Sequence, residues 1–412
     1  MSRDRRAVVK EITPTGRALA VLDDGRRVFV SGVVQGETVL VRPDRKGHHA
    51  HLLKVLAPSA QRIDPPCAHV AECGGCDLMH LPAEARRELH RRHVRELLSR
   101  AGCENTEVGS IAMHEAPAQL GYRTRARFFV RGQRVGYRAA RSHRLAAVEH
   151  CVVLRPELDP VIEELAGWLA GAKGEGEALV ALGAGNRPVV ELRWNGSLDA
   201  SIFAGADARV REGTWAGVRI WMEGATKPAA FGHPSAVVTA ADGAPLLLEG
   251  FGQASEWGGN ALATRVAEIV RACAPRTIVE LYAGSGTLSV ALAPLAERFT
   301  AVEAAPEAAR CLRENLAARG SSAKIVVDDA AKTSHRADVV VLDPPRSGAA
   351  EVMSSLVTTR PKHVVYVSCD ASTLARDAAV LCRAGYGLYS IDVFELFPQT
   401  SHFETVAHFE RR

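Results

Sequence analysis

Short apolar runs broken by glycine-containing turns fill the first 58 residues of the chain. Five such runs have the length and alternation of strands, and pairs such as Asp24-Gly25 separate them. Five strands in so short a segment predict a small OB-like β-barrel over residues 1–58. The pair Pro65-Pro66 follows and is typical of a linker.

Residues 59–250 mix helical and strand patterns. Apolar residues recur at helical spacing over 82–101, which predicts an amphipathic helix. The arginine-rich stretch 122–145 alternates like an antiparallel hairpin with its turn at 131–133. Residues 152–250 are rich in Gly, Ala and Trp and carry no sharp motif. We therefore expect a central α+β domain over 59–250.

From residue 251 to 412 the pattern becomes a regular alternation of strands and helices. Strands are predicted at 277–281, 299–302, 325–327, 339–342 and 364–368, and helices at 288–296, 306–319 and 371–384. Alternating units predict an α/β fold with a doubly wound, Rossmann-like parallel sheet. Two last strands, 387–394 and 402–409, have no helix between them, so the sheet should gain one antiparallel strand.

Three chemical groups fall where these strands end. Cys369 directly follows the run 364–368, Asp343 follows 339–342, and a glycine-rich turn follows 277–281. Ligands in open α/β sheets bind at the carboxyl ends of the strands. A thiol, an acid and such a turn in one domain indicate covalent chemistry beside a bound cofactor. Taken alone, a free cysteine is more often a buried apolar filler.

The glycine-rich turn around Gly284 lets the backbone approach a ligand closely. Glu303 ends the next strand and is placed to accept both hydroxyls of a ribose, which fits NAD or S-adenosylmethionine. Ser289 stands where the dinucleotide fingerprint has its third glycine. That difference, the corner at Asp343 and the terminal hairpin favour S-adenosylmethionine, whose adenine Asp329 could face.

Nine cysteines in a chain that we expect to be cytoplasmic indicate metal binding or catalysis rather than disulfides. Cys67, Cys73 and Cys76 have Cx5CxxC spacing, and Cys151 follows far downstream. Four thiolates bind zinc or an iron-sulfur cluster, and the spacing alone leaves both open. His69 is a weaker candidate ligand. The other cysteines outside the catalytic position are expected to be structural: Cys103, Cys273, Cys311 and Cys382.

Basic residues are clustered although the net charge is only +4. Residues 1–54 hold 11 Lys and Arg against 6 Asp and Glu, and the stretch from Leu120 to Val148 holds eight arginines and no acid. Arginines interleaved with aromatic residues suit phosphate contacts and base stacking, so RNA is the expected partner rather than a merely solvated sheet face. No apolar run reaches about 18 residues, and the first residues lack the apolar stretch of a signal peptide, so we expect no membrane contact and a cytoplasmic location.

Five motifs together resemble one known family. They are Cx5CxxC with a late cysteine, Leu-Tyr-Ala-Gly-Ser-Gly, Asp-Pro-Pro-Arg-Ser-Gly, Tyr-Val-Ser-Cys-Asp and Phe-Pro-Gln-Thr-Ser-His-Phe-Glu-Thr-Val. The chain resembles, over almost its whole length, the uracil-C5 RNA methyltransferases that make 5-methyluridine. The specific likeness is to the branch with an N-terminal TRAM domain and an iron-sulfur cluster.

The resemblance assigns a role to individual residues. It implies Cys369 as nucleophile and Glu404 as base. It implies S-adenosylmethionine binding by four residues, namely Gln253, Tyr282, Glu303 and Asp343. It implies a 4Fe-4S cluster on the four cysteines, namely Cys67, Cys73, Cys76 and Cys151. Thr287 is a departure, since relatives often carry Asn after the Gly-Ser-Gly turn.

The implied reaction begins with attack of the Cys369 thiolate on C6 of uracil, which makes C5 nucleophilic toward a methyl group. Glu404, or else His402 two residues before it, then removes the C5 proton. The target uridine, in tRNA or 23S rRNA, must be unpaired or flipped, and we expect a monomeric enzyme. Two alternatives are a non-catalytic RNA-binding protein and a DNA cytosine-C5 methyltransferase. The latter class places its cysteine after the fourth strand, whereas Cys369 follows the fifth.

Overall fold

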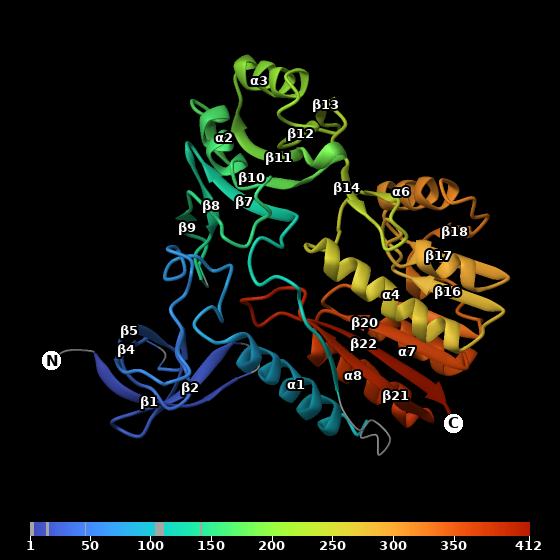
Figure 1. The fold of residues 1–412 in the computed structure, drawn as a ribbon, viewed down its shortest axis with the longest axis horizontal. Coiled ribbons are helices and arrows are strands. Elements are labelled where there is room, and N and C mark those ends of the chain that lie inside the picture. Colours follow the sequence, from blue (N-terminus) through green and yellow to red (C-terminus); the bar gives the residue numbers. More distant parts are fainter. Residues whose placement is uncertain (1–3, 14–15, 46, 104–110, 141) are drawn as a thin grey trace.

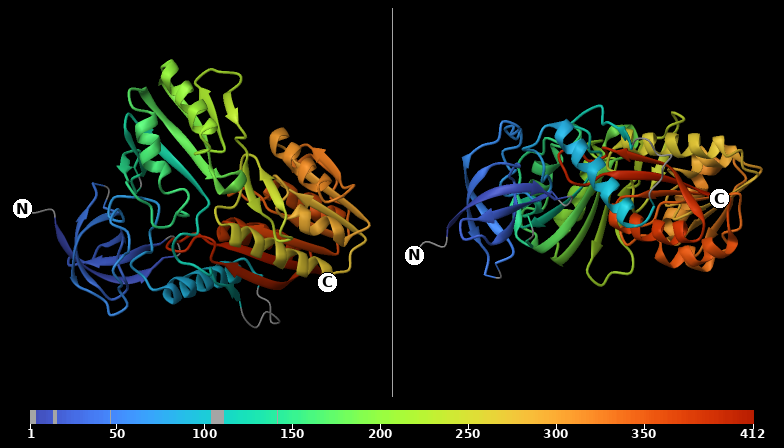
Figure 2. Two further views of the ribbon diagram at one scale, coloured as in Figure 1. Left: turned by 45° about the horizontal axis from the view of Figure 1, so that its top comes forward. Right: turned by 90° about the horizontal axis from the view of Figure 1, so that it is seen from below.

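The computed structural model describes residues 4–13, 16–45, 47–103, 111–140 and 142–412. Three lobes are visible in Figure 1, with the amino terminus on the first and the carboxyl terminus on the third. Figure 2 shows from two further sides that each lobe is built around its own sheet. None of the helices in these ranges is long and apolar enough to cross a membrane.

The first lobe is a five-stranded antiparallel sheet of order β3-β2-β1-β4-β5. Its strands are β1 (Arg5–Ile12), β2 (Arg17–Leu22), β3 (Arg27–Ser31), β4 (Thr38–Pro43) and β5 (Ala50–Ala57). Alternate residues point inward, so that Val28 and Val30 are fully buried while Phe29 between them is not. A bridge between Phe29 and His49 brings the ends of the sheet together. The predicted OB-like barrel is confirmed.

The second lobe holds a seven-stranded sheet of order β13-β12-β11-β10-β7-β8-β9. Its strands are β7 (Arg125–Arg131), β8 (Arg134–Arg138), β9 (Leu145–Ala147), β10 (Lys173–Leu182), β11 (Pro188–Ser197), β12 (Gly217–Met222) and β13 (Ala229–Gly232). Helices α2 (Val161–Trp168) and α3 (Ala200–Arg211) pack on one face, and η1 (Ala184–Asn186) joins β10 to β11. The predicted hairpin is confirmed, with its turn at Gly132.

The third lobe is an eight-stranded sheet of order β18-β17-β16-β19-β20-β22-β21-β6. Its strands are β6 (Ala112–His114), β16 (Thr277–Leu281), β17 (Arg298–Glu303), β18 (Lys324–Val327), β19 (Val339–Leu342), β20 (His363–Ser368), β21 (Tyr386–Phe394) and β22 (Glu404–Arg411). Strand β22 is antiparallel to both neighbours, as the terminal hairpin predicts. Strand β6 comes from the middle of the chain, and its place at this edge was not predicted.

Helices cover both faces of this sheet. One face packs on α4 (Glu256–Ala272), α5 (Ser289–Leu292) and α6 (Pro306–Ala317), and the other on α7 (Ala350–Thr359), α8 (Ala371–Arg383) and α1 (Ala83–Arg100). The predicted helix 288–296 is wrong in length, because α5 ends at Leu292 and a 3₁₀ turn, η2 (Ala293–Leu295), follows. Pro294 has no backbone N–H to continue an α-helix. A further turn, η3 (Ala330–Lys332), follows β18.

A small two-stranded sheet lies between the second and third lobes. Its strands are β14 (Ala236–Thr239) and β15 (Pro245–Leu248), and Leu246 and Leu248 are buried in the same core as α4. The boundaries at residues 58 and 250 stay predictions.

One pair of cysteines corrects the expectation that this chain forms no disulfides. Cys103 and Cys382 are bonded, with their Cα atoms 6.0 Å apart. Helix α1 packs on α8, so the residues just after α1 meet the end of α8 although 279 positions separate the two cysteines. An expectation drawn from the number of cysteines and the cellular redox conditions contains no information about such a contact.

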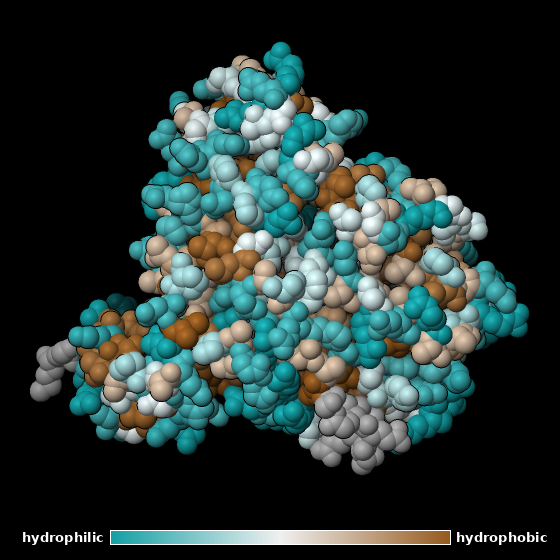
Figure 3. All heavy atoms as spheres, in the orientation of Figure 1, coloured by the Kyte–Doolittle hydropathy of each residue, from teal (hydrophilic) through white to brown (hydrophobic). Residues whose placement is uncertain are grey.

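The face shown in Figure 3 is mostly hydrophilic, and its hydrophobic side chains are scattered in small groups. Among the described residues with large apolar side chains, Phe251 is the most exposed, at 77%. Phe251 belongs to the loop before α4 and lines a cavity beside the glycine-rich turn. Its exposure therefore marks the edge of a candidate site.

Candidate functional site

Two adjacent strands bring Cys369 and Glu404 together at the carboxyl edge of the third sheet. Strand β20 ends at Ser368, β22 begins at Glu404, and the register pairs Ser368 with Thr405. The Thr405 hydroxyl donates to the Ser368 carbonyl over 3.0 Å and fixes this register. Cys369 therefore comes directly opposite Glu404, which is only 2% exposed. Asp343 follows the neighbouring strand β19 at the same edge.

Burial disfavours negative charge in this group of side chains. Burial, and then the carboxylates of Glu404 and Asp343, raise the pKa of Cys369 to about 12, against the lowering effect of Arg346. Burial also raises the pKa of Asp343 to about 7, and burial with Asp343 raises the pKa of Glu404 well above its usual value. One carboxylate oxygen of Glu404, Oε2, has no hydrogen-bond partner among the described atoms. The site is suited to a positively charged ligand and to proton transfer.

The helix that follows Cys369 favours a negative charge on the thiol. Asp370 caps α8 by accepting hydrogen bonds from the backbone N–H groups of Ser372 and Thr373, at 2.9 and 3.0 Å. Cys369 precedes this cap and so lies near the positive end of the helix dipole. Such a position favours a thiolate.

The glycine-rich turn after β16 forms a small cavity of about 40 Å³ with the loop before α4. Gln253, Tyr282, Gly284 and Asp343 line it. Tyr282 has a φ of 62°, which is strained for a non-glycine residue and is typical of ligand-binding turns. Gly284 has a φ of 56°, and a Cβ there would meet no atom within 4 Å, so the space beside it is open. The buried amide oxygen of Gln253 has no partner among the described atoms.

Two predicted cofactor residues lie beside this cavity rather than in its wall. Glu303 accepts hydrogen bonds from the backbone N–H groups of Gly284 at 2.8 Å and Ala305 at 2.7 Å. Asp329 caps η3 by accepting a hydrogen bond from the Ala331 N–H at 3.0 Å. Burial, and then the charge of Asp329, raise the pKa of Tyr282 to about 12. Both acids are exposed enough to meet a ligand that extends out of the cavity.

Sequence reasoning missed Glu280, which also lines the cavity. Its side chain is 1% exposed, and the Ser289 hydroxyl donates to it over 2.6 Å. Burial, the largest cause, raises the pKa of Glu280 to about 8. The signal in the sequence is a carboxylate inside the apolar run 277–281, because burying a charge there costs free energy unless it is paired or hydrogen-bonded. Ser289, noted only as a missing glycine, is its partner.

The four predicted ligand cysteines all line a second, larger cavity of about 260 Å³. Cys67, Cys73 and Cys76 lie on the loop before α1, and Cys151 lies between β9 and α2. The Tyr137 hydroxyl contacts the Cys151 sulfur at 3.5 Å. The predicted set is therefore assembled from distant parts of the sequence around one space. His69 lines the same cavity.

Glycine is needed between Cys73 and Cys76. A Cβ on Gly74 would come within 2.8 Å of the Arg138 carbonyl, and the Gly74 N–H donates to that same oxygen over 3.1 Å. The Gly75 N–H lies 3.4 Å from the Cys73 sulfur. These contacts hold the CxxC turn against the loop after β8.

His402 differs from its prediction. Strand β22 begins at Glu404, so His402 lies in the preceding turn, where its N–H donates to the Thr400 hydroxyl over 3.1 Å. Thr400 also bonds the Phe397 carbonyl at 2.8 Å, and this tight turn replaces the first two residues of the predicted strand. His402 lines the larger cavity together with Arg346. The cavity thus extends from the four cysteines toward the edge of the sheet that carries Cys369 and Glu404.

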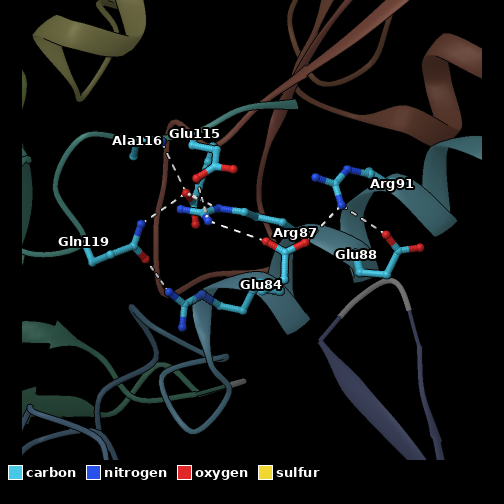
Figure 4. A network of polar contacts seen from close by, with 9 residues as sticks. Glu84, Arg87, Glu88, Arg91, Glu115, Ala116 and Gln119 are labelled. Atoms are coloured by element: carbon cyan, nitrogen blue, oxygen red, sulfur yellow. Dashed lines mark hydrogen bonds and ion pairs between the residues drawn. The ribbon is translucent and has the colours of Figure 1, made fainter. Parts of the chain in front are cut away.

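A polar network fastens the loop between β21 and β22 to helix α1 (Figure 4). Glu395, 1% exposed, begins this loop and accepts from Arg87 at 3.0 Å, Gln119 at 3.1 Å and the Ala116 N–H at 3.3 Å. Arg87 also contacts Glu115 at 2.7 Å. The network joins α1 and the segment after β6 to the loop that leads to Glu404.

Replacing Arg87 with alanine should lower the free energy of unfolding by about 3 kcal/mol, because it removes the cation beside a buried carboxylate. The neighbouring Arg91 is a matched control on the same helix, since its ion pairs among the described residues are with the exposed Glu84 and Glu88. Arg91→Ala should cost less than about 1 kcal/mol. Urea unfolding of the two variants measures the difference, and equal midpoints would contradict a structural role for the network.

The arginine-rich hairpin divides into buried and exposed side chains. Arg125 is largely enclosed: it donates to the Gly250 carbonyl over 2.6 Å, and burial lowers its pKa. Arg127, two residues on, is 66% exposed, pairs with Glu177 at 3.3 Å and lines the larger cavity with Arg123. Arg127 and Arg123 therefore remain available to a phosphate, whereas Arg125 holds the loop before α4. Arg141 lies outside the described residues.

Known proteins are similar to this chain over nearly its full length. A family model described as conserved hypothetical protein 95 matches residues 265–381. The 23S rRNA (uracil(1939)-C(5))-methyltransferase RlmD of Halomonas elongata is 34% identical, over 98% of this chain and 88% of that protein. The protein of the same name from Thiobacillus denitrificans is 33% identical, over 96% and 97%.

A solved structure shares the fold. The Pyrococcus abyssi tRNA (uracil-54, C5)-methyltransferase, in complex with S-adenosyl-L-homocysteine, superimposes with a TM-score of 0.77 at 20% identity. The match covers 98% of this chain and 100% of that one. At this identity the likeness establishes the arrangement of the three lobes.

Proposed function

The chain belongs to the family of RNA (uracil-C5-)-methyltransferases, and from this premise we propose that it methylates C5 of a uridine in 23S rRNA through a covalent bond between Cys369 and uracil C6. The observation that carries the proposal is the position of Cys369 opposite the buried Glu404, which follows from the register that pairs Ser368 with Thr405. The full-length relatives named for 23S rRNA support ribosomal RNA over tRNA as the substrate.

The thiolate of Cys369 adds to C6, and the electron pair of the C5–C6 double bond moves toward C5 and the C4 carbonyl. S-adenosylmethionine, when bound, supplies an electrophilic methyl group. C5 takes that methyl group, and the electron pair of the broken S–CH3 bond stays on the sulfur of S-adenosylhomocysteine, the leaving group. Glu404 accepts the C5 proton, and the electrons of the C5–H bond rebuild the double bond. The sulfur leaves C6 with its electron pair, so the thiolate is restored and one proton is released overall.

The environments of Cys369 and Glu404 support their proposed roles as nucleophile and base. Arg346 and the start of α8 favour the Cys369 thiolate, while burial opposes it. A bound cation would favour the Cys369 thiolate further, because it would offset the repulsion that Glu404 and Asp343 exert on a negative charge there. The raised pKa of Glu404 makes its carboxylate a stronger base than an exposed glutamate, which suits removal of a carbon-bound proton.

We propose six residues as the S-adenosylmethionine site. The unpartnered amide oxygen of Gln253 and the open space beside Gly284 fit a polar ligand that approaches the backbone. The acids around the cavity suit a sulfonium cation and ribose hydroxyls. Thr287 also lines the cavity and offers a hydroxyl where relatives often carry an amide. The six residues are Gln253, Tyr282, Gly284, Glu303, Asp329 and Asp343.

The proposed reaction is tested with purified protein and S-adenosylmethionine labelled in its methyl group. Label should enter a 23S rRNA fragment as 5-methyluridine, and tRNA transcripts and single-stranded DNA of the same base sequence should take up far less. A preference for tRNA would refute the substrate, and 5-methylcytosine in DNA would refute the family reaction for this chain.

We propose that Cys67, Cys73, Cys76 and Cys151 hold a 4Fe-4S cluster. A tetrahedral zinc site brings its sulfurs within about 3.8 Å of one another, given Zn–S bonds of about 2.3 Å. No three of these four cysteines, all described by the structure, place their sulfurs within 4.8 Å of one another. Wider spacing around a common cavity suits a cluster, in which each thiolate binds a different iron. The reaction needs no electron transfer, so the cluster would organise the loop beside the RNA.

Protein purified without oxygen should be brown and contain about four irons and four sulfides per chain, with broad absorption near about 400 nm. Cys73→Ser should lose both iron and colour, whereas Cys311→Ser, a buried cysteine in α6, should keep them. Metal and acid-labile sulfide analysis measures this. Zinc that disappears in Cys73→Ser, without iron or sulfide in the parent protein, would contradict the cluster.

RNA is the proposed partner of the exposed arginines around the larger cavity, with the target uridine unpaired or flipped toward Cys369. We propose three domains, over residues 1–58, 59–250 and 251–412, and a monomeric enzyme. Each of the three large sheets falls within one of these segments except for β6, which supports the division.

A further inference from the structure

Three possible metal ligands meet at the other end of the third sheet. Cys273 directly follows helix α4, His363 begins β20, and His408 lies near the end of β22. The register pairs His363 with Glu410, so His408 and His363 project from the same face of the sheet, toward α4. Within the described part of the chain, these form the one group of three His, Cys, Asp or Glu residues whose ligand atoms all lie within 4.8 Å.

The distances match the edges of a tetrahedron around one ion. His363 Nδ1 lies 3.2 Å from His408 Nε2, and Cys273 Sγ lies 3.8 Å from the same nitrogen. Zinc with Zn–N bonds of about 2.05 Å and a Zn–S bond of about 2.3 Å places two nitrogens about 3.3 Å apart and sulfur about 3.6 Å from nitrogen. A hydrogen bond between the two imidazoles explains the 3.2 Å between their nitrogens. It does not explain why the Cys273 sulfur lies 3.8 Å from the same His408 nitrogen.

We propose that Cys273, His363 and His408 bind one Zn²⁺, with the fourth position open to water. A thiolate and two imidazoles select zinc over magnesium or calcium, which take oxygen ligands. The Cys273 thiol contacts the Ile269 carbonyl at 3.2 Å and the His408 imidazole at 3.8 Å, and loss of its proton on metal binding would turn it into a thiolate ligand. The inference does not depend on the proposed reaction.

Charges around the three ligands are compatible with a cation. Glu410 lies two residues beyond His408 on the same face of β22 and acts electrostatically on both Cys273 and His363. Arg265 is the nearby positive charge that acts on His408, and it is paired with Asp392 at 3.0 Å. Tyr389 contacts the His408 ring edge-on at a centroid distance of 5.2 Å. Lys362 acts on both Cys273 and His363 with the opposite sign to Glu410, and Asp338 adds a second negative charge near His363.

The position indicates a structural role. The ion would join the end of α4 to the start of β20 and the end of β22. These two strands carry Cys369 and Glu404 at their opposite ends, and His408 lies four positions after Glu404, about 13 Å along a strand. Zinc here would fasten the catalytic strands to α4 without touching the reacting groups.

Cobalt, a spectroscopic substitute for zinc, provides the test. The full-length Cys73→Ser protein, in which the larger cysteine site is impaired, is stripped with a chelator and titrated with Co²⁺. One equivalent should bind and give the visible absorption of tetrahedral cobalt with a thiolate charge-transfer band. The double variant Cys73→Ser/Cys273→Ser should lose that equivalent, whereas Cys73→Ser/Cys311→Ser should keep it.

A second measurement guards against misfolding of a variant. Zn²⁺ should raise the midpoint of thermal unfolding of Cys73→Ser by several degrees, because it binds the folded state. It should not raise the midpoint of Cys73→Ser/His408→Gln, which circular dichroism can show to be folded. Equal cobalt binding with and without Cys273, or no tetrahedral cobalt in Cys73→Ser, would overturn the proposal.

Discussion

Cys369→Ala is expected to abolish methylation, with a loss of turnover of roughly 10⁴-fold or more, as for removal of other catalytic nucleophiles. Without a sulfur to add to C6, the uracil ring cannot become nucleophilic at C5, and no other group replaces that step. Label from S-adenosylmethionine should therefore not reach uridine. RNA binding should persist, because Cys369 lies at the sheet edge and its replacement by alanine removes only one sulfur atom from a half-buried position.

Cys311→Ala is the matched control for this loss. Cys311 lies in α6 of the same lobe and is 1% exposed. Its replacement should cost stability but leave the rate per folded molecule near that of the parent. Methyl transfer by Cys369→Ala at a rate within about tenfold of the parent would show that no covalent bond to sulfur is needed.

The catalytic edge could be predicted because two sequence signals coincide there. Strands of a parallel sheet are buried on both faces and appear as continuous apolar runs, so β16, β19 and β20 were visible with nearly their observed bounds. A polar residue directly after such a run must then lie at the carboxyl edge. Asp343 and Cys369 were found in this way, whereas Glu404 was singled out only by the resemblance to the methyltransferase family.

Features that depend on contacts between distant segments could not be predicted. Nothing local indicates that β6 joins the edge of the third sheet or that Cys103 meets Cys382. Arg125 and Arg127 carry the same charge two residues apart, yet one is enclosed by the loop before α4 and the other is exposed. Hydrophobic periodicity reports which face of an element is buried, not which segment buries it.

The two candidate metal sites show that sequence spacing does not report the distances between side chains. The spacing of Cys67, Cys73 and Cys76 predicts a ligand set, although among the described residues no three of these sulfurs and that of Cys151 lie within 4.8 Å of one another. Cys273, His363 and His408 have no motif, since 90 positions separate the first two, yet their ligand atoms lie within 4.8 Å. A site assembled by sheet register and helix packing is visible only when the strands are in place.

Glu404→Gln is expected to fail in a different way, by trapping the enzyme on its RNA. Glutamine is nearly the same size and fills the same buried position, but its amide does not accept a proton from carbon. Cys369 still adds to C6 and C5 still takes the methyl group, so the reaction should stop with methylated RNA bound to the sulfur. Turnover should fall by about 10²–10⁴-fold, the usual contribution of a general base.

The trapped species is measured on a denaturing gel after reaction with methyl-labelled S-adenosylmethionine. Glu404→Gln should give a labelled band of protein plus RNA, Cys369→Ala/Glu404→Gln should give none, and Glu268→Gln, an exposed change on α4, should turn over like the parent. His402 provides the competing outcome, because it lies two residues from Glu404 in the turn that lines the larger cavity. If Glu404→Gln turns over normally while His402→Ala accumulates the labelled band, the C5 proton leaves to His402, and Glu404 serves only to shape the charge around Cys369.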